Sequence, residues 1–268
     1  MSAGMHSLGD LEALAYQVAM GADEAISETP VNRYAQSAAL VAQKAAPPRV
    51  APGPVPRPTE ETAAEDAIGA ARALSGAATT LEELEAALAA FEHCDLKRGA
   101  RSLVFCDGRP EARVMIIGEA PGRDEDIEGR PFVGRAGKLL DRMLGAIDLG
   151  RSATDAERAV YITNILPWRP PQNRDPKPEE IAMMKPFVER HVELVGPDLL
   201  VLMGNISCQA MLGRRGITRL RGSWTETLVR PALPMFHPAY LLRNPAAKRE
   251  AWADLLSLKA RLRQSARP

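Results

Sequence analysis

The stretch VMIIGEAPGRDEDIEGRPFVGRAGKLLDRML, residues 114–144, decides the class of fold. Its first four residues are apolar and Gly118 ends the run, which is typical of a short buried strand. A helical pattern follows from Ala136 to Ile147. A buried strand followed by a helix is the beginning of a βαβ unit, so this stretch predicts a parallel sheet covered by helices.

The same alternation continues along the chain. Further strands are expected at 160–165, 199–203 and 232–236, and further helices at 178–194, 206–212 and 245–263. We therefore predict a three-layer α/β/α fold around a four-stranded parallel sheet. Ligands of such sheets bind beyond the carboxyl ends of the strands. The four ends carry GEAPG, Asn164, Gly204-Asn205 and His237-Pro238.

The N-terminal third is organised differently. Apolar residues at helical spacing predict a helix within 8–28, six prolines in PPRVAPGPVPRP predict an extended linker, and Thr80 with Glu83 predicts a helix from about 81 to 91. The chain is divided accordingly into a helical extension (1–45), a proline-rich linker (46–61), a helical lead-in (62–93) and the main domain (94–268).

Charge is unevenly distributed although the net charge is zero. Residues 1–93 hold 5 Lys and Arg against 13 Asp and Glu, whereas residues 94–268 hold 29 against 21. A basic domain suits a polyanion such as nucleic acid, and an ordinary charged surface explains the same counts. No apolar run approaches the ~18 residues of a membrane helix, and the first residues lack a secretory pattern. We expect a cytoplasmic protein without membrane contact.

Three motifs at the strand ends have two readings each. GEAPG is a phosphate-binding turn or a tight strand-to-helix connection, and it matches neither common nucleotide motif. The loop NILPWRPPQNRDPKPEE, residues 164–180, is a functional loop or a connector. In FHPAYLLRNP, His237 is catalytic or structural, and Leu241-Leu242-Arg243 is an exposed wedge for a base stack or a packed helical turn.

Together these motifs resemble the type-4 uracil-DNA glycosylases, a branch of the uracil-DNA glycosylase superfamily. The resemblance also includes LLVLMG and ITRLRGSW and spans about residues 94–260. It implies a glycosylase-like fold and hydrolysis of the N-glycosidic bond of uracil in DNA, which leaves an abasic site for base excision repair. A non-catalytic uracil- or DNA-binding relative is the alternative, and retention of the polar set favours the enzyme.

The resemblance implies roles for individual residues. Phe132 would stack on the flipped base, Asn164 would bind the uracil edge beside Gly118, and His237 would donate to the base carbonyl. Glu119 and Glu125 are the candidates for holding the attacking water. An Asn side chain offers one donor and one acceptor side by side, which matches uracil O4 and N3–H and mismatches cytosine.

Contacts with DNA are expected from loops that flank the strand ends. The candidates are Arg169, Arg174, Arg219, Arg221, Leu241, Leu242 and Arg243. Uracil-containing DNA is the expected partner of a monomeric protein, and residues 1–45 are a possible arm for a repair partner.

One departure from the family concerns its cofactor. The resemblance implies a [4Fe–4S] cluster held by four cysteines, but the corresponding positions here are Phe91, Cys94, Trp168 and Met184. Cys94 is the only remaining ligand candidate, and a cluster needs about four thiolates. We expect no cofactor and no metal, with apolar side chains filling the volume of the cluster.

Overall fold

The computed structural model describes residues 15–18, 20 and 60–264, and the chain divides into two compact units, Met1–Arg57 and Pro58–Pro268. In the first unit, residues 15–18 form a helical turn within the helix expected at 8–28. The rest of that helix and the proline-rich segment 47–58 lie outside the described residues. The division of the N-terminal third into extension and linker therefore stays a prediction.

The second unit alternates strands and helices in the order predicted. Its strands are β1 (Asp107–Gly108), β2 (Val114–Gly118), β3 (Val160–Asn164), β4 (Leu199–Met203), β5 (Thr225–Thr227) and β6 (Arg230–Met235). Its α-helices are α3 (Glu60–Ala77), α4 (Leu81–Ala90), α5 (Leu96–Gly99), α6 (Arg123–Glu128), α7 (Arg135–Gly145), α8 (Pro178–Val195), α9 (Asn205–Leu212), α10 (Ile217–Leu220), α11 (Pro238–Arg243) and α12 (Lys248–Gln264). Two 3₁₀ turns, η1 (Pro171–Asn173) and η2 (Pro245–Ala247), precede α8 and α12.

The sheet has the order β1-β3-β2-β4-β6-β5. Its four central strands are parallel, as predicted, and the two edge strands are antiparallel. The predicted count of four strands is therefore too low by these two edges. Both are very short and polar, Asp107-Gly108 and Thr225–Thr227, so they carry no apolar pattern that would reveal a strand.

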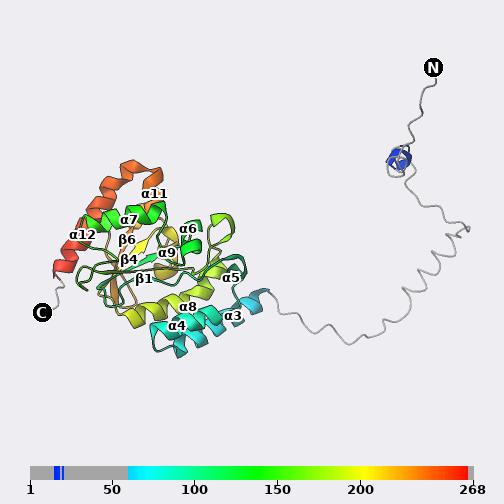
Figure 1. Ribbon diagram of the computed structural model, residues 1–268, viewed down its shortest axis with the longest axis horizontal. Helices are drawn as coiled ribbons and strands as arrows, with labels where there is room; N and C mark the ends of the chain where they lie inside the picture. Colours follow the sequence, from blue (N-terminus) through cyan, green and yellow to red (C-terminus); the bar gives the residue numbers. More distant parts are fainter. Residues whose placement is uncertain (1–14, 19, 21–59, 265–268) are drawn as a thin grey trace, which may run out of the picture. The chain divides into compact units, whose positions relative to one another are not determined.

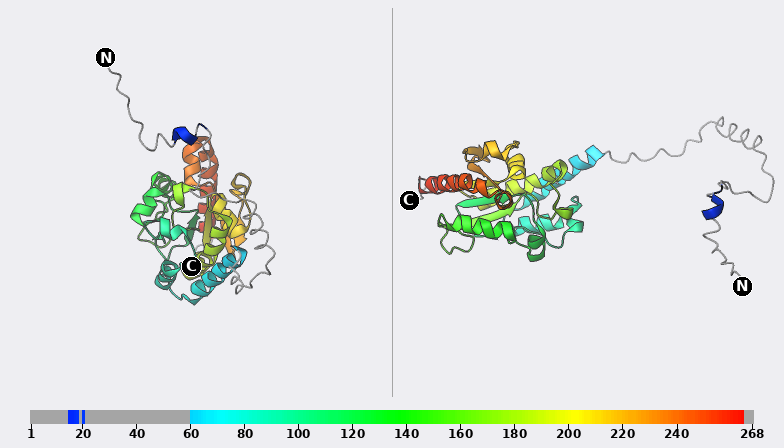
Figure 2. Two further views of the ribbon diagram at one scale, coloured as in Figure 1. Left: turned by 90° about the vertical axis from the view of Figure 1, so that its right-hand side faces the viewer. Right: turned by 90° about the horizontal axis from the view of Figure 1, so that it is seen from above.

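Helices cover both faces of the sheet (Figure 1). Val114 and Ile116 of β2 face a core shared with α7 and α12, whereas Met115 and Ile117 belong to the core on the other face, with α3, α4 and α8. Figure 2 shows α12 and the pair α3 and α4 on opposite sides of the sheet. The three-layer prediction is confirmed, and a sheet buried on both faces explains the mostly apolar sequences of its central strands.

The helical lead-in packs on the main domain. Helices α3 and α4 contact α8, and Thr80 caps α4 by accepting a hydrogen bond from the backbone of Glu83 (3.2 Å), as the sequence predicts. Within the described part of the chain, no helix is both long enough and apolar enough to span a bilayer.

Candidate active site

A cavity of about 520 Å³ lies at the carboxyl edge of the parallel strands. Strands β2 and β3 end side by side, because Gly118 pairs with Asn164 in the sheet register. Strands β4 and β6 end together as well, where the Gly204 amide donates to the Met235 carbonyl oxygen (3.0 Å). Glu119, Phe132, Asn164 and His237 all line the cavity, so the four strand ends meet as predicted.

Phe132 holds an unusual backbone conformation at the wall of the cavity. Its φ is +55°, a left-handed conformation that costs a non-glycine residue about 1–2 kcal/mol. Its side chain is buried, with the ring centroid 5.4 Å from that of His237. Gly137 makes the conformation possible, because a Cβ there would lie 1.7 Å from the Phe132 carbonyl oxygen. Such local strain is typical of functional sites.

Asn164 carries an unpaired acceptor. Its side chain is buried, and Oδ1 has no hydrogen-bond partner among the described residues, where it is the one buried side-chain polar atom in this condition. An unpaired buried acceptor costs about 1–3 kcal/mol. Gly118 leaves room for this group, since a Cβ there would lie 2.3 Å from Oδ1 and 2.6 Å from the Phe132 ring. An unpaired acceptor and an aromatic ring therefore lie side by side at the wall of the cavity.

His237 is a neutral donor held by its own helix. Nδ1 accepts a hydrogen bond from the Ala239 amide (3.2 Å) and so caps α11. Burial lowers the pKa of His237 to about 4, and the nearby Arg243 charge acts in the same direction. A neutral ring that accepts at Nδ1 carries its proton on Nε2. The imidazole thus has one N–H left to donate.

Glu119 lines the cavity and has a raised pKa. Burial raises the pKa of Glu119 to about 7, and the charge of Asp175 adds to this, whereas Arg215 and Arg243 oppose it. All three of these charged residues line the same cavity. A carboxyl group that titrates near neutral pH is suited to general base catalysis.

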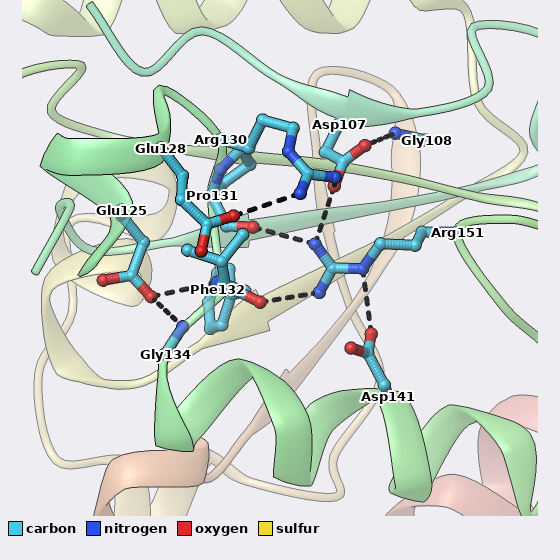
Figure 3. Close-up of polar contacts among 11 residues, drawn as sticks. Asp107, Gly108, Glu125, Glu128, Arg130, Pro131, Phe132, Gly134, Asp141 and Arg151 are labelled. Carbon is cyan, nitrogen blue, oxygen red and sulfur yellow. Dashed lines mark hydrogen bonds and ion pairs between the residues drawn. The ribbon is translucent and has the colours of Figure 1, made fainter. Parts of the chain in front are cut away.

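Glu125 lines the cavity but is engaged by the backbone. One carboxylate oxygen accepts from the amides of Val133 (3.0 Å) and Gly134 (2.9 Å), and the other accepts from the amide of Gly122 (3.0 Å). Figure 3 shows the side chain reaching the loop that carries Phe132. Glu125 joins the GEAPG turn to that loop.

The predicted DNA-contacting arginines differ in their partners. Arg174 pairs with both carboxylate oxygens of Glu180 (2.9 and 2.5 Å). Arg221 pairs with Asp254 and lies over the Phe236 ring. Arg169 donates to Asn173 (2.7 Å). The side chains of Arg219 and Arg243 are exposed, and only Arg174 and Arg243 of the five line the cavity.

Two findings concern residues that the sequence analysis misjudged or missed. The expectation of an exposed Leu241-Leu242 pair is wrong for Leu241, which is fully buried in the apolar core, while Leu242 is half-buried. The first turns of α11 pack inward, because the apolar residues of a short amphipathic helix face the core. Arg215 was missed, although it lines the cavity and is exposed; the RR pair after α9 was its only signal.

Buried side chains of the apolar core occupy the positions that correspond to the family's cluster ligands. Phe91, Cys94, Trp168 and Met184 are all buried and belong to one apolar core. Burial raises the pKa of the Cys94 thiol, which favours the protonated form over the thiolate that binds metals. No group of three or more His, Cys, Asp or Glu side chains in the described ranges is arranged to hold a metal ion. These residues do not fit an iron–sulfur cluster.

Comparison with known proteins agrees with this geometry. Residues 105–256 match the family model of the uracil DNA glycosylase superfamily. The chain is 35% identical to the type-4 uracil-DNA glycosylase of Archaeoglobus fulgidus over 186 residues, 65% of this chain and 89% of that protein. It is 36% identical to the type-4 enzyme of Sulfurisphaera tokodaii over 192 residues, 67% of this chain and 84% of that protein. For the type-4 enzyme of Thermotoga maritima the identity is 38% over 154 residues, 56% and 77% of the two chains.

Proposed function

Because the chain belongs to the type-4 family of the uracil DNA glycosylase superfamily, we propose that it hydrolyses the N-glycosidic bond of uracil in DNA. The base would leave as free uracil and the DNA would keep an abasic site. The observation that carries this proposal is the unpaired Oδ1 of Asn164 in a cavity walled by Phe132. A buried acceptor without a partner is stable only at a cost, which a ligand donor removes.

Base recognition follows from these two residues. A uracil swung out of the duplex stacks on the Phe132 ring, which contributes about 1–3 kcal/mol. Its N3–H donates to Asn164 Oδ1, and the amide nitrogen of Asn164 donates to uracil O4. Cytosine presents an acceptor at N3 and an amino group at C4, so both contacts become repulsive. The same pocket therefore rejects the normal base.

Bond cleavage uses His237 and Glu119. As the bond between C1′ and N1 stretches, its electron pair moves onto the base and the sugar becomes cationic. The Nε2–H of His237 donates to uracil O2, where negative charge develops, and such a preorganised donor contributes about 3–4 kcal/mol. Glu119 accepts a proton from water while the water oxygen bonds to C1′, which yields the hydroxyl of the abasic sugar. The uracil anion takes up a proton from solvent to become free uracil, and Glu119 returns its proton to solvent. Glu125 supports this set by holding the loop of Phe132.

DNA would cross the mouth of the cavity. Arg243 and Arg215 line it with exposed side chains and are the first candidates for phosphate contacts. Arg169 of the loop after β3, Arg219 of α10 and the half-buried Leu242 of α11 are further candidates. Arg174 and Arg221 are engaged by Glu180 and Asp254, so their contribution to binding is smaller. Leu241 is buried and is left out of the interface.

The proposed reaction needs no iron–sulfur cluster. Phe91, Trp168 and Met184 fill the volume with apolar side chains, and none of the steps above passes through this region. The non-catalytic alternative is not favoured, because the residues for base recognition and for bond cleavage line one cavity. We retain the prediction of a cytoplasmic monomer that acts on DNA. A repair partner for residues 1–45 also stays a prediction.

The test is excision from a uracil-containing oligonucleotide, followed by alkaline cleavage of abasic sites. Wild-type protein should release uracil from single strands and from U:G pairs. Asn164→Asp should lose most of this activity, because a carboxylate only accepts hydrogen bonds and cannot donate to O4. Asn244→Asp, a change of the same chemistry at an exposed position outside the cavity, should retain it. Absence of product with stoichiometric wild-type protein refutes the proposed function.

A further inference from the structure

Two side chains of opposite charge hold the loop Pro131–Gly134. Arg151 donates from one terminal nitrogen to the Pro131 carbonyl oxygen (2.8 Å) and from the other to the Phe132 carbonyl oxygen (2.9 Å). Glu125 accepts from the next two amides, those of Val133 and Gly134. Three successive peptide groups are thus bound by charged side chains, as Figure 3 shows. Hydrogen bonds to ionised groups are stronger than neutral ones.

Arg151 is itself fixed in direction. Its Nε donates to Asp141 of α7 (2.9 Å), and one terminal nitrogen also donates to Asp107 of β1 (2.9 Å). The Arg151 side chain is only 12% exposed. A guanidinium group with donors on three nitrogens in one plane serves all four acceptors at once, which the single ammonium of a lysine cannot do.

The position held in this way is the strained one. Phe132 has a φ of +55°, and the bond from Arg151 goes to the carbonyl oxygen of that same residue. Strained conformations persist where the surrounding contacts determine them. Arg151, Asp107 and Asp141 do not line the cavity, so the guanidinium affects the ring through the backbone of the loop.

We propose that Arg151 is a positioning residue that sets the Phe132 ring at the stacking distance from the extruded base. Asp141 and Asp107 orient its guanidinium. The inference rests on the proposed function for its kinetic consequence, but the geometry of the ring in the free protein follows from the contacts alone. Arg151 would affect excision through Phe132 and through no other residue of the cavity.

A double-mutant cycle tests this route. In single-turnover excision, Arg151→Ala and Arg151→Lys should both be slower, by up to about 100-fold for the alanine variant. In a Phe132→Ala background, Arg151→Ala should have almost no further effect, because the ring that it positions is gone. Equal effects of Arg151→Ala in both backgrounds overturn the proposal. Arg190→Ala is the matched control, since Arg190 also binds a carbonyl oxygen, that of Ala78, and a carboxylate, that of Glu193, and none of these three residues lines the cavity.

The second readout needs no catalysis. The His237 ring lies beside the Phe132 ring, so its proton signals in a nuclear magnetic resonance spectrum report the ring position. Arg151→Ala and the milder Asp141→Asn should shift the His237 signals in the absence of DNA, whereas Arg190→Ala should not. Unchanged His237 signals in both variants refute the positioning role. If wild-type protein excises no uracil while these signals move, the proposed function fails and the positioning of Phe132 stands.

Discussion

The Phe132 ring and the His237 imidazole are neighbours, with centroids 5.4 Å apart and planes inclined by 31°. The first belongs to the loop between α6 and α7 and the second follows β6 as the N-cap of α11, so the fold brings together an aromatic ring and a neutral N–H donor. The two would act at different times in the reaction. Stacking stabilises the extruded base from the start, whereas the donor gains strength only as charge develops on the base.

His237→Ala should slow bond cleavage much more than it weakens binding. A hydrogen bond to a neutral carbonyl contributes ~0.5–1.5 kcal/mol, whereas one to the developing anion contributes ~3–4 kcal/mol, or about 100- to 1000-fold in rate. Single-turnover excision should fall accordingly, with little change in affinity for uracil DNA or in melting temperature. If rate, affinity and melting temperature decline together, His237 only caps α11.

Gly118→Ala should abolish base recognition without unfolding the protein. The new Cβ would lie 2.3 Å from Asn164 Oδ1 and 2.6 Å from the Phe132 ring, so both groups must move. Gly69→Ala, within α3, is the matched control because its Cβ meets no atom within 4 Å. Excision assays with both variants at equal folded fraction check this, and an active Gly118→Ala protein contradicts the assignment of the pocket.

Excision should rise with pH through the pKa of Glu119. Burial raises that pKa to about 7, so the carboxyl group is protonated and inactive as a base at lower pH. The single-turnover rate should increase about tenfold per pH unit below 7 and level off above it. Since His237 has a pKa of about 4, it stays neutral throughout this range and adds no second inflection to the plot of rate against pH.

Two variants identify the titrating group. The excision rate of Glu119→Gln should be low and should not change with pH between about 5 and 8, a range that brackets the Glu119 pKa of about 7. Asp175→Asn removes a negative charge that raises the pKa of Glu119, so its rate profile should move to lower pH. An unchanged profile in both variants assigns the titration to another group.

Binding to uracil DNA should weaken steeply with salt although the net charge of the chain is zero. Each phosphate contact contributes ~0.9 to the slope of log affinity against log salt. Arg243→Ala and Arg215→Ala should each lower the slope by about 1, measured by fluorescence anisotropy. Arg263→Ala, at the other end of α12 from α11, is the control, and an equal loss of slope there shows that the arginines of the cavity have no special part.

The purified protein should be colourless and active without iron. Three of the four ligand positions hold Phe91, Trp168 and Met184, and burial raises the pKa of the Cys94 thiol, which disfavours the thiolate. Treatment with an oxidant and a chelator should leave excision unchanged. Stoichiometric iron in anaerobically purified protein, lost together with activity on this treatment, contradicts the prediction.

The elements found from sequence are those with strong local patterns. The four central strands contain runs of buried apolar residues because both faces of the sheet are covered, and α4 is marked by its capping residue. The strand ends then predicted which motifs would meet. The edge strands β1 and β5 were missed because hydrogen bonding to a neighbour, rather than an apolar pattern, makes them strands.

The supporting contacts of the site had no comparable signal. Arg151 lies 10 residues from Asp141 and 44 from Asp107, separations that correspond to no helical or strand period. The burial of Leu241 likewise depends on the orientation of a six-residue helix, which two adjacent leucines do not determine. Such details depend on tertiary packing, whereas motif order depends only on topology.

The unpaired carbonyl oxygen of Asn164 has a consequence for the protein at rest. Among the described residues of the protein without a bound base, no donor meets this acceptor. Asn164→Leu would remove this unpaired acceptor. The variant should unfold at a higher denaturant concentration than the wild type and should no longer recognise its substrate. The asparagine thus marks a point where folding alone would have selected a different residue, and where the requirement of the reaction overrides that of the fold.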